Sequence, residues 1–130
     1  MAKEEYLLRL VALEQEINKL EQQMQIIEQQ VLEIQTIQIC LQELEKSKEK
    51  QMFANLGKNI FIKTEIQDKN LFMDVGNRIF VKKNISDTLK IVEEQLIRLG
   101  EAKSNVLGKM QEIQQQMEQI VVEAEKSEKK

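Results

Sequence analysis

Two runs of regularly spaced apolar residues flank the middle of this chain and constrain its fold more than any other feature. Both runs alternate steps of four and three residues, which is the spacing of a coiled-coil interface. We call these positions the seam. They are Tyr6, Leu10, Leu13, Ile17, Leu20, Met24, Ile27, Val31, Ile34, Gln38 and Leu41, then Leu89, Val92, Leu96, Leu99, Lys103, Val106, Met110, Ile113, Met117, Ile120 and Ala124.

The two halves of the seam mirror each other about the centre of the chain. When residues whose numbers sum to 130 are paired, Leu41 falls opposite Leu89 and Leu10 falls opposite Ile120. An antiparallel helix pair joined by a symmetric insert requires this mirror, whereas a parallel coiled coil between two chains does not. The pattern therefore predicts a long antiparallel two-helix coiled coil within one chain.

The helices are predicted over about 3–48 and 86–126. No glycine or proline interrupts the first, which would be about 60–70 Å long at about 1.5 Å per residue. Asn84 and Ser86 precede or open the second, and either side chain can cap its first turn.

The segment between the helices, about 52–83, holds the same short phrase twice. Met52 to Lys63 matches Leu71 to Lys82, and each copy places one glycine between two apolar runs. This is the pattern of a β-hairpin, so we predict two hairpins that turn at Gly57 and Gly76. The predicted strands are near 52–56, 59–66, 71–75 and 78–83.

The predicted strands are apolar on both faces, although a strand with one wet face should alternate. A stalk of two helices is too thin to cover both faces, so strands from other subunits are expected to complete the sheet. The hairpins are thus an assembly module. Its expected contact residues are Phe53, Ile60, Phe61, Ile62, Phe72, Ile79, Phe80 and Val81.

Composition excludes several classes of function. The net charge of -3 argues against a nucleic-acid binder. The basic excess of the hairpins fits either solvated strand edges or an acidic partner. Without histidine, and with Cys40 as the one cysteine, we expect no catalytic residue, no metal site and no cofactor. No apolar run approaches the roughly 20 residues that span a membrane, and no signal peptide is visible, so we expect a cytoplasmic protein without membrane contact.

The open end of the helix pair carries more apolar residues than the seam needs. These residues are Leu7, Leu8 and Val11, then Val121 and Val122 beside Ile120. Two interpretations stay open. The surplus is a binding surface for client proteins, or it is a wide stripe that closes the two helix ends on each other.

The double hairpin between mirrored helices resembles the α-class subunit of prefoldin, and the short ends are similar to archaeal members. The residues that carry the resemblance are Leu56 to Lys63, Asp74 to Lys83 and Ser86 to Leu89. The resemblance implies an α+β fold over the single domain 1–130, with the hairpins forming an inter-subunit β-barrel.

The resemblance also implies a function and partners. It implies a hexamer of two α-type and four β-type prefoldin subunits, acting as an ATP-independent holdase that binds unfolded proteins and delivers them to a group II chaperonin. Two alternatives stay open: a self-assembling, filament-forming scaffold of the same fold, and a coiled-coil adaptor for one partner.

Overall fold

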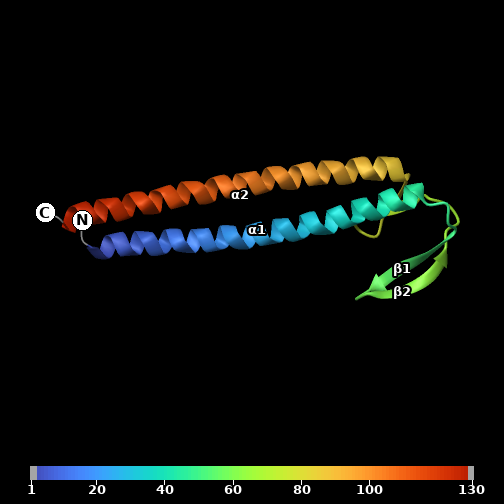
Figure 1. Ribbon diagram of the computed structural model, residues 1–130, viewed down its shortest axis with the longest axis horizontal. Helices are drawn as coiled ribbons and strands as arrows, with labels where there is room; N and C mark the ends of the chain where they lie inside the picture. The colour runs from blue at the N-terminus through green and yellow to red at the C-terminus, as the bar shows by residue number, and fades with distance from the viewer. Residues whose placement is uncertain (1–2, 129–130) are drawn as a thin grey trace. The chain divides into compact units, whose positions relative to one another are not determined.

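In the computed structural model, which describes residues 3–128, one long helix precedes two β-hairpins in the chain and a second long helix follows them. This confirms the predicted order of elements. Figure 1 shows both helices and the first hairpin. No helix in the described part of the chain is long and apolar enough to cross a membrane. The elements are α1 (Lys3–Lys46), β1 (Gln51–Gly57), β2 (Ile60–Glu65), β3 (Leu71–Asp74), β4 (Phe80–Lys83) and α2 (Ile85–Glu128).

The chain divides into two compact units. The helical unit holds the described residues up to Leu32 and those from Ile97 onward, and the hairpin unit holds Glu33–Leu96. In the helical unit the two helices lie side by side and run antiparallel (Figure 1). Lys3 Nζ lies 3.2 Å from Glu128 Oε1, and Lys103 Nζ lies 3.9 Å from Glu28 Oε1. The numbers in each pair sum to 131, one residue from the predicted mirror.

The burial pattern confirms the seam in α1. Every predicted seam position from Tyr6 to Leu41 is buried or half-buried, and Leu44 is the one other residue of α1 that is not exposed. The hydrophobic effect of this stripe, rather than helix propensity, stabilises a helix of such length.

One seam position in α2 was predicted wrongly. Lys103 is exposed, and the neighbouring Ala102 is half-buried in its place. A lysine ammonium in the seam would have lost its hydration, so the side chain instead reaches outward to Glu28. The small Ala102 fills the seam without a charge.

In the hairpin unit a small core lies where the chain enters and leaves the hairpins. Leu41, Ile85 and Val92 are buried together, and Leu71 of β3 packs against them. Asn84 caps α2, because its Oδ1 accepts a hydrogen bond from the Asp87 amide at 2.7 Å. Of the two predicted capping residues, the structure therefore selects Asn84.

The link between the hairpins is tied to the end of α1. Lys69 Nζ donates to the carbonyl oxygens of Glu45 at 3.2 Å and Ser47 at 2.7 Å. These carbonyls lie where a helix has no backbone N–H donors of its own for them, and a cation is favourable there. The link between the hairpins is thereby held against the last turn of α1.

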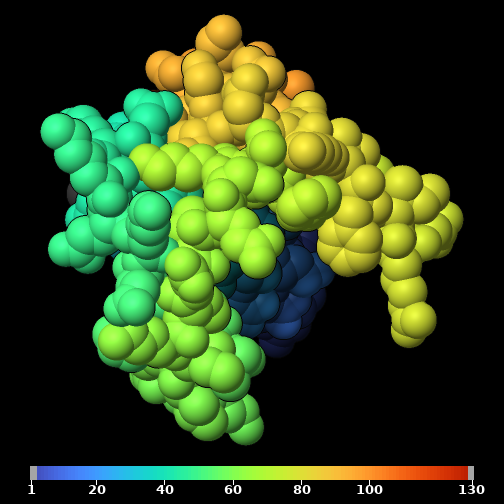
Figure 2. Space-filling model, turned by 90° about the vertical axis from the view of Figure 1, so that its right-hand side faces the viewer, coloured from blue at the N-terminus to red at the C-terminus, as the bar shows by residue number. Residues whose placement is uncertain are grey.

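The two hairpins are separate two-stranded sheets and project from the unit in different directions (Figure 2). Their turns share one geometry. Lys58 and Asn59 in the first turn, and Asn77 and Arg78 in the second, all have positive φ, as a type I′ turn requires. The glycine before each pair, Gly57 or Gly76, also has positive φ, at 122° and 117°.

Candidate functional site

An apolar groove lies between the helices where α1 begins and α2 ends. Tyr6, Leu7 and Leu10 of α1 line it from one side, and Val121 and Ala124 of α2 line it from the other. Its volume is about 200 Å³, and its polar lining comes from Lys3, Glu125, Ser127 and Glu128. Two of the predicted client-binding residues, Leu7 and Val121, thus meet in one groove.

The other predicted tip residues occupy different places. Val11 lies one turn from Leu7 on the same flank of α1 and is 50% exposed. Leu8 and Val122 face away from the seam and are 70% and 48% exposed. Ile120 is buried in the seam at 3% exposure, so it supports the helix pair rather than the open surface in this conformation.

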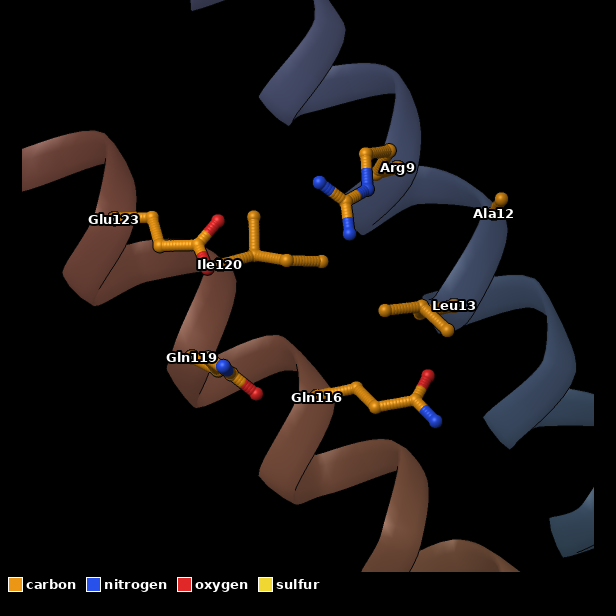
Figure 3. Close-up of a pocket in the computed structure, with 7 residues that line it drawn as sticks. All are labelled: Arg9, Ala12, Leu13, Gln116, Gln119, Ile120 and Glu123. Atoms are coloured by element: carbon orange, nitrogen blue, oxygen red, sulfur yellow. The ribbon is translucent and has the colours of Figure 1, made fainter. Parts of the chain in front are cut away.

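A second groove of about 350 Å³ lies on the opposite flank of the same helix ends. Leu13 and Ile120 point toward one another at its base, while Arg9 and Glu123 reach in from opposite helices (Figure 3). Gln116 and Gln119 also line it. We call it the polar groove, because charged and amide side chains surround a small apolar base.

Helix geometry explains why the two grooves differ. Successive residues turn by about 100°, so Leu7 and Arg9 lie on opposite flanks of the seam, as do Val121 and Glu123. The apolar flank therefore receives Leu7 and Val121 together, and the polar flank receives Arg9 and Glu123 together. Sequence reasoning found the surplus apolar residues but did not separate the two flanks, although the spacing held that signal.

The strand pairing separates two faces on each hairpin. In the first hairpin Ala54 pairs with Ile62, while Phe53 pairs with Lys63. Because side chains alternate along a strand, these pairs lie on opposite faces. We call them the aliphatic face and the aromatic face.

The second hairpin repeats the arrangement. Met73 pairs with Val81 on its aliphatic face, and Phe72 pairs with Lys82 on its aromatic face. Lys63 and Lys82 each lie opposite a phenylalanine, so the aromatic face of each hairpin carries apolar and charged side chains together.

Most of the predicted assembly residues are exposed in the isolated chain. Phe53 and Phe72 are 66% exposed, Phe80 is 62% exposed and Phe61 is 54% exposed. Ile60, Ile62 and Ile79 are also at least half exposed, and Val81 is 36% exposed. Isolated two-stranded hairpins with this much exposed apolar surface are poorly stable in water and have unpaired edges. Such exposed apolar strands are suited to pairing with strands of another chain.

Comparison with known proteins agrees with this architecture. The family model described as "Prefoldin subunit" matches residues 13–130. Among solved structures, filamentous PFD from Methanocaldococcus jannaschii, determined by cryo-electron microscopy, matches with a TM-score of 0.76 and 14% sequence identity. The match covers 88% of this chain and 97% of that one. The search of curated proteins found no match. Because the family match spans nearly the whole chain, we conclude that this protein belongs to the prefoldin family.

Proposed function

We propose that the chain is an α-class prefoldin subunit and that it acts as a molecular chaperone. It holds unfolded proteins without ATP, performs no enzymatic reaction and delivers its clients to a group II chaperonin in the cytoplasm. All of residues 1–130 serve as one prefoldin-like domain. The observation that carries the proposal is the apolar groove at the helix tips, where Leu7 and Val121 add apolar surface outside the seam.

A holdase needs apolar surface that adapts to many partners, and exposed apolar patches commonly mark such binding sites. Leu7, Leu8 and Val11 are each at least half exposed, and Val121 and Val122 are more than two-fifths exposed. None of the five belongs to the seam, so they are available to a client without unfolding the helix pair.

The hairpins supply the assembly on which such a chaperone depends. We expect two chains of this kind to join four β-type subunits through both hairpin faces in an inter-subunit β-barrel. The exposed phenylalanines of the aromatic face are the main support, since their burial contributes about 1.5–3 kcal/mol each.

The test is suppression of aggregation of a chemically denatured client. A variant with Leu7→Ser, Val11→Ser and Val121→Ser should lose most of the protection while keeping its helix content and its assembled mass. The matched control is Ile97→Ser with Leu107→Ser, which removes exposed apolar side chains elsewhere in the helical unit. If the tip variant protects the client as well as the control does, the tip is not the client site.

A second candidate function is a self-assembling scaffold of the same fold. The observation that favours it is the likeness to a prefoldin described as filamentous. Native mass spectrometry separates the two, with the chain purified alone and after co-expression with candidate β-type subunits. A closed heterohexamer supports the chaperone, and long homopolymers support the scaffold. Saturable binding to one folded partner without holdase activity would instead indicate a coiled-coil adaptor.

A further inference from the structure

The two grooves at the helix tips differ in the charges around them as well as in their lining. Arg9 and Glu123 bring opposite charges to the polar groove. At the apolar groove, Glu125 and Glu128 line the rim, and the one lysine there, Lys3, is ion-paired to Glu128 at 3.2 Å.

Further carboxylates lie on the same flank as the apolar groove. Glu4 and Glu14 lie three residues before and seven residues after Leu7, and Glu118 lies three residues before Val121. Residues three, four or seven apart share a helix face, so these side chains extend the acidic rim along both helices. All three are exposed.

The rim is therefore mainly acidic. Among the described residues of this flank, five glutamates at positions 4, 14, 118, 125 and 128 outnumber one lysine, Lys3, and their formal charges sum to -4. An apolar groove rimmed by carboxylates attracts cations over about 8 Å at physiological ionic strength and disfavours anionic partners.

The size of the groove limits what enters it. At about 200 Å³ it is smaller than the 300–1,000 Å³ typical of small-molecule sites, so it suits individual side chains of an extended segment. Glu125 and Glu128 themselves line the groove, so residues on either side of that segment can reach these carboxylates.

We propose that the tip selects unfolded segments whose apolar side chains are flanked by lysine or arginine. The apolar side chains enter the groove beside Leu7 and Val121. The flanking cations lie against Glu125, which lines the groove, and against Glu118, three residues before Val121 on α2. This specificity rests on the proposed function, because it assumes that clients bind at the tip.

The test uses three fluorescent peptides that share one apolar core and carry lysine, serine or glutamate on both sides. Their affinities for the full chain in its native assembly are measured by fluorescence anisotropy at low and high salt. We expect the lysine-flanked peptide to bind about 10-fold more tightly than the glutamate-flanked one at low salt, with a smaller difference at high salt.

Paired variants locate the effect. Glu118→Gln with Glu125→Gln should bring the affinities for the lysine-flanked and glutamate-flanked peptides close to each other. The control, Glu16→Gln with Glu123→Gln, removes the same charge from the opposite flank and should keep the preference.

The outcomes separate the two proposals. If the serine-flanked peptide binds through Leu7 and Val121 but the three peptides bind equally, the charge selectivity is wrong and the tip remains the client site. Survival of the preference in the Glu118 and Glu125 variant also overturns the selectivity. If no peptide binds, or if Leu7→Ser with Val121→Ser leaves the peptide affinities unchanged, both the tip assignment and the charge selectivity are wrong.

Discussion

The seam and the hairpins are built from similar apolar side chains, yet only the seam is covered by its own chain. Ile113 and Ile120 of the seam are 8% and 3% exposed, whereas Phe53 and Phe72 of the hairpins are both 66% exposed. The helices can therefore fold from contacts within one chain, while we propose that other subunits cover the hairpins. Stability and assembly should respond to different substitutions.

The largest expected effect is on assembly. Phe61→Asp with Phe80→Asp places carboxylates on the aromatic face of both hairpins, where burial of a charge is costly. We expect the assembled mass to fall to that of the isolated chain, while helix content by circular dichroism stays nearly unchanged.

The matched control for this variant is Ile97→Asp with Leu107→Asp, which adds the same charge at exposed positions of the helical unit. The control should assemble normally. A collapse of helix content in the hairpin variant would contradict the claim that the seam stabilises the helices independently of the hairpins.

A seam substitution should show the reverse response. Ile113→Ala removes buried methyl groups and should lower the free energy of unfolding by about 2–3 kcal/mol. Ile97→Ala, at a position that is 58% exposed, should change it by less than about 0.5 kcal/mol. Urea unfolding followed by circular dichroism measures both, and equal losses would mean that the seam is not where the helices gain their stability.

The next prediction concerns the cap of α2, where the second hairpin leads into the helix. Asn84→Ala removes the acceptor for the Asp87 amide and should destabilise the helix by about 1 kcal/mol. Ser86→Ala is the control, because Ser86 is exposed and lies inside the first turn. Similar unfolding midpoints for the two variants would show that Asn84 is not the cap.

The smallest expected effect concerns the link between the hairpins. Lys69→Met removes two hydrogen bonds to the end of α1 and should cost about 0.5–1 kcal/mol in urea unfolding. Lys48→Met removes another exposed lysine near the end of the same helix and should be close to neutral. An equal cost for both would argue for a general charge effect.

Much of the fold was predictable because helix and hairpin periods are strong local signals. The seam of α1 was predicted at every position, since four-three spacing follows directly from helix geometry. The error at Lys103 has a physical cause: spacing alone places a residue in the seam, but the cost of burying an ammonium moves the helix contact to Ala102.

The hairpin faces were less predictable. Ile60-Phe61-Ile62 is apolar throughout, so the sequence shows no alternation from which to choose a face. Only the pairing register assigns Ile62 to one face with Ala54 and Phe61 to the other with Lys63. The turn fixes that register, and it depends on Lys58 and Asn59 adopting positive φ, which lysine seldom does.

The candidate site was predicted in part. Surplus apolar residues such as Leu7 and Val121 were visible as departures from the seam, and the structure brings these two together in one groove. The acidic rim was missed because carboxylates such as Glu118 are common on exposed helix faces. Their distribution carries meaning only when each flank is considered separately.

Hydroxyl-radical footprinting of the assembled protein tests most directly whether other subunits cover the hairpins while the chain covers its own seam. We expect Phe53 and Phe72 to be protected from oxidation in the assembly and labelled in the dissociated Phe61→Asp, Phe80→Asp variant, with Tyr6 labelled weakly in both. Equal labelling of Phe53 and Phe72 in both samples would contradict the account, because the exposed hairpins would then remain uncovered in the assembled protein.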